Sequence, residues 1–246
     1  MIELEVISTE RLSPSMVRVN FTSADLSGFA ASADTDRYVK LQFPQPDGTT
    51  VARTYSVPIV DVAAGTLSID FVIHPDPDGN LVGYAAPWAA AAQPGDQISV
   101  RGPGGGYAPD PSADWHLLAG DESALPAIGA ALAELPQHAV GYAVIDAPAG
   151  HEQDLVAPTG MVVRWVDGTL AESLKALPWR PGRVQVFVHG EAQTVMHEIR
   201  PWLFTDLRIP RDDVSVSGYW RRGRTEETFR AWKRELAASE SDSSRS

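Results

Sequence analysis

The 246-residue sequence contains no cysteine. This absence excludes disulfide bonds, thiolate nucleophiles, cysteine-bound iron–sulfur clusters and thiolate zinc sites. No apolar run reaches the roughly 18 residues that a membrane-spanning helix needs, so we expect no membrane insertion. The first residues carry Glu3 and Glu5 and lack the basic region and apolar core of a secretory signal. These features predict a protein of the cytoplasm.

Positive charge is also scarce. Twenty Lys and Arg residues stand against 32 Asp and Glu residues, which gives a net charge of −12. Nucleic acids and anionic membranes require a basic surface, so we expect neither as a partner. The few cations gather near the end of the chain, where fourteen residues contain Arg221, Arg222, Arg224, Arg230, Lys233 and Arg234. Such a cluster can bind an anion on an otherwise acidic protein.

The first hundred residues predict an antiparallel β-barrel. Six short segments are rich in β-branched and aromatic residues, and turn signals separate them: 1–12, 16–23, 38–44, 51–60, 66–74 and 96–103. Short strands at close spacing are typical of a barrel. An alanine-rich stretch at 83–92, which ends at Pro94-Gly95, predicts one helix.

After the glycine-rich stretch 102–106, strands and helices alternate. Strands are predicted at 115–120, 139–145, 161–166, 183–190 and 214–220, and helices at 123–136, 169–177, 191–204 and 225–239. This repetition predicts an open parallel sheet covered by helices. We therefore divide the chain into a barrel domain (1–110), an α/β domain (111–238) and a polar, disordered tail (239–246).

The segment Arg53-Thr54-Tyr55-Ser56 lies in a predicted barrel strand and could form a flavin cradle. An aromatic ring can stack on the isoalloxazine, a hydroxyl can bond its N5 edge, and an arginine can pair with the pyrophosphate. Alternation along a strand places Arg53 and Tyr55 on one face, with Thr54 and Ser56 on the other. The alternative is that these four residues form an ordinary β-strand with one aromatic side chain.

A second candidate is the helix that follows His74. A helix amino end favours phosphate, and the small residues Ala85 and Ala86 let a backbone approach closely. The alternative is a plain connecting helix in which Trp88 fills the core and His74 is structural.

Two strand-to-helix corners of the predicted parallel sheet carry acidic residues. Asp121, Glu122 and Ser123 follow one strand, and Gly190-Glu191 follows another. Such corners meet the nucleotide in doubly wound folds. Acids would repel a phosphate, so we expect a role near a nicotinamide or the flavin edge. A helix capped by Ser123, with no ligand, is the alternative.

The last corner is basic and aromatic. Tyr219 and Trp220 precede Arg221, Arg222 and Arg224, and this arrangement suits an anion pocket. A solvated basic surface is the alternative. Lys40, in the predicted strand 38–44, is added to these arginines as a candidate cation for an anionic substrate.

Taken together, these blocks resemble the siderophore-interacting protein family, the FAD-dependent ferric-siderophore reductases of the ferredoxin-reductase-like superfamily. The matching pieces are RTYS, the His before GYAAPWAAAAQPGD, RGPGGGY, LAGDESALPAIGAAL, HGEAQTV and VSGYWRRGRTEE, which fall in the family's order over roughly residues 4–235. The resemblance implies an FAD-binding barrel and an NAD(P)H-binding domain. The chain departs from the family in the loop after His74, where PDPDGNLV intervenes and Pro87 precedes Trp88.

By that resemblance, cofactor contacts come from four groups of residues. The flavin contacts are matched by Arg53, Tyr55 and Ser56, and the FAD-phosphate loop is matched by His74, Ala85, Ala86 and Trp88. Asp121, Glu122 and Ser123 match the block near the nicotinamide, and later blocks are matched by Gly190, Glu191, Tyr219 and Trp220. Neither a catalytic acid or base nor a metal ligand is expected.

The expected function is transfer of electrons from NADH or NADPH, through non-covalent FAD, to Fe(III) in a siderophore, with release of Fe(II). Siderophore oxygen donors hold Fe(III) tightly and Fe(II) weakly, so reduction frees the metal. Two alternatives stay open: a general NAD(P)H–flavin oxidoreductase with another acceptor, and a flavin-bound siderophore carrier without turnover. Ferredoxin stays open as the electron donor.

Overall fold

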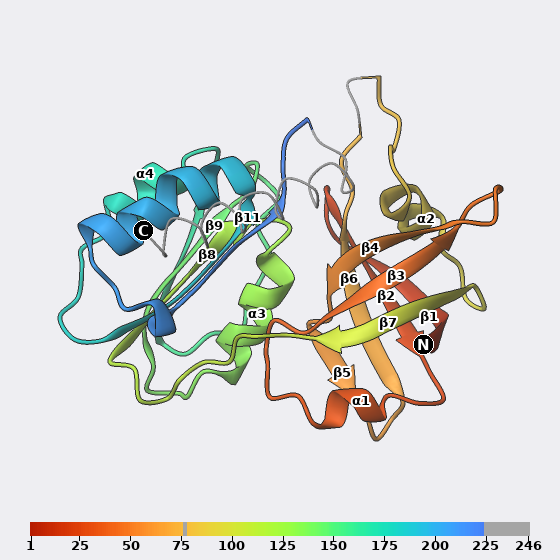
Figure 1. Cartoon of the computed structure of the whole chain (residues 1–246), viewed down its shortest axis with the longest axis horizontal. Helices are drawn as coiled ribbons and strands as arrows, with labels where there is room; N and C mark the ends of the chain where they lie inside the picture. The colour runs from red at the N-terminus through yellow and green to blue at the C-terminus, as the bar shows by residue number, and fades with distance from the viewer. Residues whose placement is uncertain (76–77, 224–246) are drawn as a thin grey trace, which may run out of the picture.

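The computed structural model describes residues 1–75 and 78–223. Two sheets divide these residues into a barrel part and an α/β part that lie side by side (Figure 1). Arg224, the predicted helix 225–239 and the predicted tail 239–246 lie outside the described residues. In the part of the chain that is described, no helix is long and apolar enough to cross a membrane.

The barrel part is one curled, antiparallel sheet of seven strands in the order β4-β3-β7-β1-β2-β6-β5. Its strands are β1 (Ile2–Ser13), β2 (Met16–Thr22), β3 (Tyr38–Pro44), β4 (Thr50–Ser56), β5 (Ile59–Asp61), β6 (Thr66–Val72) and β7 (Gln97–Gly104). The prediction of a single strand at 51–60 is wrong, because Val57-Pro58 separates β4 from β5. Proline has no N–H to donate to a sheet. These two consecutive strands are the edges of the open half-barrel.

Alternation along the strands builds the barrel core. Val17, Val19 and Phe21 are buried on β2, and apolar side chains of β3, β6 and β7 pack against them. The predicted helix 83–92 is confirmed as α2 (Ala85–Ala91), and a four-residue helix, α1 (Ser27–Ala30), adds Phe29 to the same core.

The α/β part has a five-stranded, wholly parallel sheet, which confirms the predicted architecture. Its strand order is β10-β9-β8-β11-β12, with β8 (Trp115–Asp121), β9 (Val140–Asp146), β10 (Gly160–Val166), β11 (Val184–Glu191) and β12 (Val214–Trp220). This order has its reversal point between β8 and β11, the position where open α/β sheets bind ligands.

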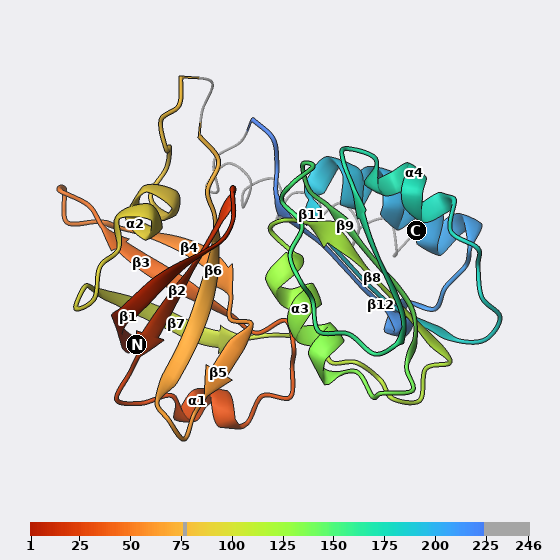
Figure 2. The same cartoon turned by 180° about the vertical axis from the view of Figure 1, so that it is seen from behind.

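Helices cover both faces of the parallel sheet. α3 (Leu125–Glu134) lies between the sheet and the barrel part in both views (Figures 1 and 2). The other face is covered by α4 (Leu170–Lys175) and two π-helical segments, η1 (Gln193–Ile199) and η2 (Trp202–Asp206). The predicted helix 191–204 is confirmed: Arg200 and Pro201, between the two π-helical segments, keep helical dihedral angles, so the chain is helical from 192 to 206. A single 3-10 turn, η3 (Arg211–Asp213), precedes β12.

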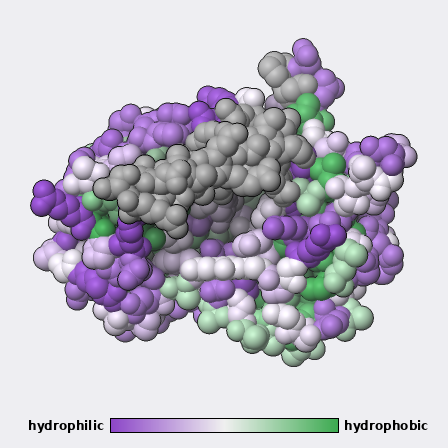
Figure 3. Space-filling model, viewed as in Figure 1, coloured by the Kyte–Doolittle hydropathy of each residue, from purple (hydrophilic) through white to green (hydrophobic). Residues whose placement is uncertain are grey.

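Met16 joins the two parts. This fully buried barrel residue packs in one apolar cluster with α3, β8 and β9. On the face drawn in Figure 3, the visible α/β part is mostly hydrophilic, whereas the barrel also carries small hydrophobic groups. The two parts therefore share an apolar interface beside the carboxyl ends of the parallel strands.

Candidate functional site

Asp121 binds the carboxyl ends of three parallel strands together. Its Oδ2 accepts hydrogen bonds from the Glu191 main-chain N–H and the Trp220 indole N–H, both at 2.7 Å. Its Oδ1 accepts from the main-chain N–H of Ser123 at 2.9 Å and from the Ser123 hydroxyl at 2.5 Å. Burial raises the pKa of Asp121, and these hydrogen bonds oppose the rise. A single carboxylate thus fixes β8, β11 and β12 relative to one another.

Ser123 does not cap α3, which rules out the alternative role considered for it. The residue before α3 is Ala124, which makes no side-chain cap, and the Ser123 hydroxyl donates to Asp121 instead.

Gly190 is required at the neighbouring corner, at the end of β11. Its φ is +146°, and a Cβ there would lie 2.8 Å from the Asp121 carboxylate. The glycine therefore permits the bond between the β8 and β11 corners.

Glu191 organises the chain that leaves β12. Its two carboxylate oxygens accept from the main-chain N–H of Arg222 at 3.2 Å and of Thr194 at 3.0 Å. Arg221 donates to the Gln193 side-chain oxygen at 3.2 Å. The acidic corner thus meets the basic corner, as the predicted parallel pairing of the last strand requires. Both arginines are held at the edge where Asp121 lies.

Further acids border Arg222. Burial raises the pKa of Asp146, at the end of β9, while a hydrogen bond from the Gly168 N–H lowers it. The charges of Asp167 and Glu122 also raise this pKa, and the charge of Arg222 lowers it. The carboxyl edge is therefore a mixed surface, with two arginines next to several carboxylates.

Tyr219 extends from the parallel sheet toward the barrel, where the hydroxyl of Ser56, the last residue of β4, lies close enough to act on its phenol. Burial raises the pKa of Tyr219 and the charge of Asp36 adds to the rise, whereas the nearby Ser56 hydroxyl lowers it. On the sheet side, the His189 ring lies edge-on at 4.8 Å from the Tyr219 ring. Two predicted site residues from opposite parts of the chain are thus brought into contact.

Arg53 and Tyr55 lie on β4, an edge strand of the described sheet. Their register partners Leu41 and Val39 are two residues apart on β3, so both side chains lie on one face of the sheet, as predicted. The Tyr55 ring packs 4.6 Å from Phe71, and the Arg53 guanidinium lies 5.0 Å from the exposed ring of Tyr84. A partly buried aromatic ring beside a cation and a hydroxyl suits a planar cofactor that carries a pyrophosphate.

The segment predicted as a phosphate loop has a mixed outcome. Ala85 is buried and the Trp88 ring packs among Phe21, Phe43 and Phe71 at 5.9–6.3 Å, in the barrel core. The Trp88 ring is only partly buried, so its contact with a phosphate loop stays a prediction. A role of Ala85 and Ala86 at a phosphate stays a prediction.

His74 lies beside Glu122. The His74 Nε2 is 3.3 Å from one Glu122 carboxylate oxygen, and His151 and Ser15 contact the other oxygen. The sequence analysis did not include Ser15 and His151 among the site residues, since no local motif marks either one. Among the described residues no group of histidines and carboxylates has the geometry of a metal site.

Lys40 lies apart from the arginines. It is exposed on β3, between Thr54 of β4 and Arg101 of β7 in the sheet. Arg101 is a second exposed cation on this strand pair, in the glycine-rich block that sequence analysis matched without naming it.

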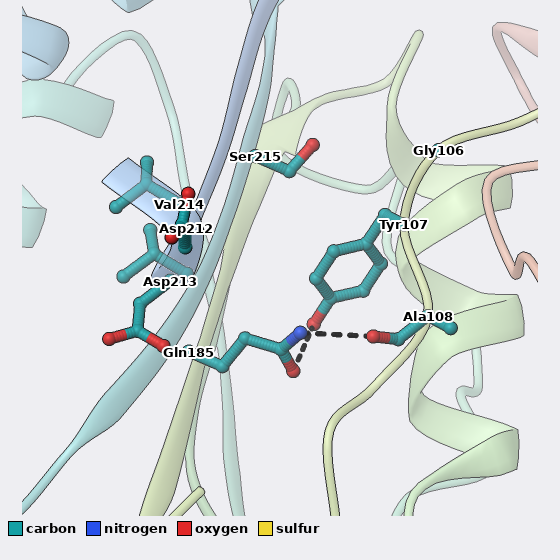
Figure 4. Close-up of a pocket in the computed structure, with 9 residues that line it drawn as sticks. Gly106, Tyr107, Ala108, Gln185, Asp212, Asp213, Val214 and Ser215 are labelled. Carbon is teal, nitrogen blue, oxygen red and sulfur yellow. Dashed lines mark hydrogen bonds between the residues drawn. The ribbon is translucent and has the colours of Figure 1, made fainter. Parts of the chain in front are cut away.

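One pocket, of about 200 Å³, lies at the opposite edge of the parallel sheet (Figure 4). Tyr107, Gln185 and Ser215 line it together with Asp212 and Asp213. The Gln185 side chain bonds the Ala108 carbonyl at 2.9 Å, so its amide holds the linking loop in place. This acid-lined pocket at the amino ends of β11 and β12 does not suit an anionic cofactor.

Comparison with known proteins agrees with this geometry. The chain matches the family profile of the siderophore-interacting protein over residues 113–223 and that of the siderophore-interacting FAD-binding domain over residues 5–52 and 48–107. It belongs to the siderophore-interacting protein family. The barrel part is the FAD-binding domain of that family, and the protein is accordingly a siderophore-related flavoprotein of the oxidoreductase class.

Relatives cover almost the whole chain. An uncharacterised protein of Mycobacterium tuberculosis is 44% identical over 96% of this chain and 95% of its own length. The ferric vibriobactin reductase of Vibrio cholerae is 32% identical over 92% of this chain and 91% of its own length. The crystal structure of a siderophore utilization protein from T. fusca superimposes with a TM-score of 0.79 at 35% identity, covering 91% and 93% of the two chains.

Removal of the Asp121 charge should loosen the whole edge. In an Asp121→Asn variant, an amide N–H₂ replaces one carboxylate oxygen. That group cannot accept the hydrogen bonds which the oxygen received, either those from Ser123 or those from Glu191 and Trp220. We expect the free energy of unfolding to fall by about 1–3 kcal/mol. Chemical denaturation measures this, with exposed Asp154→Asn as the control. Equal stability of the two variants would show that the hydrogen bonds of Asp121 contribute nothing.

Proposed function

We propose that this protein transfers electrons from NADH or NADPH to Fe(III) in a siderophore and thereby releases Fe(II) in the cytoplasm. The carrying observation is that Tyr219, at the end of β12, packs in one apolar cluster with Met16 of the barrel and lies near Ser56, so the FAD-binding domain lies against the carboxyl edge of the parallel sheet. A flavin held along β4 would there be within reach of a nucleotide bound at the strand reversal between β8 and β11.

The residues of β4 and β12 suit FAD. In the proposal, Arg53 pairs with the pyrophosphate, Tyr55 stacks on the ring system, and the Ser56 hydroxyl, oriented by Tyr219, faces the flavin edge. When bound, FAD accepts two electrons as a hydride and delivers them singly. The protein has to hold the cofactor, exclude water from it and dock the two substrates.

Asp121 and Glu191 support the nucleotide site indirectly. Their carboxylates accept hydrogen bonds within the protein, so their proposed role is to fix the shape of the edge that the nicotinamide enters. We place the nucleotide at the carboxyl edge of the parallel sheet, and the turnover experiment below distinguishes NADH from NADPH.

Arg221 and Arg222 would offset the repulsion between this acidic protein and an anionic iron chelate. A protein of net charge −12 repels an anionic ferric siderophore over most of its surface. Arg221 and Arg222 supply a local positive charge beside Trp220, whose ring is 39% exposed. We infer that the chelate docks there, next to the carboxyl edge.

Turnover under anaerobic conditions tests the proposed function. Protein loaded with FAD is mixed with NADH or NADPH, a panel of ferric siderophores and a chelator that traps Fe(II). We expect the flavin absorbance to bleach with at least one nucleotide and the trap to accumulate Fe(II) catalytically. A flavin that dithionite reduces and neither nucleotide bleaches would exclude nicotinamide as the donor and favour ferredoxin.

The same experiment separates the alternatives. A carrier would bind the ferric chelate while reduced flavin stays reduced. A general flavin oxidoreductase would bleach with nucleotide and pass electrons to other acceptors, with no Fe(II) formed from any siderophore. The relationship to the Vibrio cholerae ferric vibriobactin reductase supports the reductase over both.

Loss of the docking charge should slow the acceptor step alone. In an Arg221→Ala/Arg222→Ala variant we expect FAD content to stay the same and binding of an anionic chelate to weaken by about 1–3 kcal/mol where the contacts are desolvated. Rapid mixing of reduced protein with chelate measures this, and the defect should shrink at high salt.

The control is Arg164→Ala/Arg211→Ala, which removes the same charge from exposed positions elsewhere in the α/β part. If both double variants react at the wild-type rate in low salt, Arg221 and Arg222 form only a solvated surface.

A further inference from the structure

Three residues from three segments converge on one buried carboxylate. Glu122 is 5% exposed, and the Ser15 hydroxyl donates to its Oε1. His151 Nδ1 lies 3.2 Å from the same oxygen, and His74 Nε2 lies 3.3 Å from Oε2. A further contact of 2.7 Å joins Ser15 Oγ to His151 Nδ1. We call these residues the Glu122 cluster.

The Glu122 cluster spans the two parts of the protein. Ser15 lies in the turn between β1 and β2, and His74 follows β6, so both belong to the barrel. Glu122 follows β8, and His151 lies between β9 and β10. Both oxygens of the carboxylate therefore have a partner in the barrel, and one oxygen also has a partner in its own domain.

The Glu122 carboxylate is buried, and its hydrogen bonds are directional. A carboxylate removed from water loses a large hydration free energy, so its hydrogen bonds to Ser15 and His151 are costly to break. His74, whose side chain is 56% exposed, adds a contact at 3.3 Å. Met16, next to Ser15, already holds the two parts together by apolar packing against α3. Apolar contact is non-directional, whereas hydrogen bonds require particular distances and angles. Met16 thus supplies adhesion, and the Glu122 cluster supplies orientation.

We propose that Glu122 is a positioning residue that fixes the angle between the FAD-binding domain and the parallel sheet. This inference rests on the proposed function, because that angle sets how the nucleotide edge meets the flavin strand β4. Glu122 follows Asp121 directly, so one dipeptide orders the strand ends through its first residue and orients the barrel through its second. A change in the angle would displace a nicotinamide from the flavin without removing any group that binds either one.

The cysteine-free sequence allows a direct measurement of the angle. Ala63→Cys in the barrel and Ala133→Cys in α3 are both exposed and accept nitroxide labels at two defined positions. Double electron–electron resonance on the FAD-loaded protein then gives the distance distribution between the two parts. Four changes are made in this labelled protein: Glu122→Ala, Glu122→Gln, Ser15→Ala and, as the control of equal charge, exposed Glu172→Gln.

We expect a narrow distribution in the unsubstituted protein and in Glu172→Gln, and a broadened or shifted one in Glu122→Ala. Ser15→Ala, which leaves the carboxylate in place, should broaden it as well. Glu122→Gln keeps one acceptor oxygen and should fall between. A distribution in Glu122→Ala and Ser15→Ala that matches the unsubstituted protein overturns the inference, as does equal broadening in Glu172→Gln.

Flavin bleaching supplies the second readout. At saturating nucleotide we expect Glu122→Ala to bleach about tenfold more slowly, because small displacements of reacting groups cost large factors in rate. Its affinity for FAD should change less than twofold. An unchanged bleaching rate beside a broadened distribution would refute the positioning role. If the unsubstituted protein is not bleached by nucleotide at all, the proposed function fails, and the distance distributions still decide the role of Glu122.

Discussion

The carboxylate of Asp121 is the interaction on which the site depends. Parallel strands β8, β11 and β12 come from distant parts of the chain, and Asp121, the last residue of β8, accepts hydrogen bonds from the ends of β11 and β12 and from Ser123 in the turn that follows. The glycine at 190 is what lets the second corner approach. With these ends fixed, Tyr219 faces the barrel and the following arginines face the same edge. The position of one acid thus determines where an aromatic residue and two cations stand.

Two polar contacts join the ordered strand ends of the parallel sheet to the barrel. Tyr219 meets Ser56 at the end of β4, and Glu122 meets Ser15 and His74. Both lie beside the apolar contact made by Met16. An interface of this kind, apolar packing with a few directional bonds, is stable and defined in angle. Electron transfer between two bound molecules requires such definition, because its rate depends on their separation.

Much of the fold follows from local pattern. Alternating burial on β2 and β3 and the repetition of strands and helices after residue 106 predict both sheets correctly, since period and turn residues are local properties. Pro58 shows the limit of pattern, because a β-branched run on both sides of it suggested one strand. There a missing N–H outweighs the β propensity of the neighbouring residues, whereas Pro201 lies within a continuous helix.

The candidate site was predicted in its parts and less well in its contacts. Motif residues such as Tyr219 and Ser56 could be named from the sequence, whereas their proximity joins positions on two domains and has no local signature. Ser15 and His151 were missed for that reason. A helix cap was the alternative role for Ser123 because its type and place suit one, and only the fold reveals Asp121 as a competing acceptor.

The most direct test of the account is an anaerobic titration of the fully reduced FAD-loaded protein with a ferric siderophore, with flavin absorbance and trapped Fe(II) read together. Because FAD stores two electrons and each Fe(III) takes one, the account predicts full return of the flavin absorbance with about two Fe(II) per flavin. Saturating chelate that binds while the flavin stays bleached and no Fe(II) appears would contradict the central claim that this flavoprotein reduces siderophore iron.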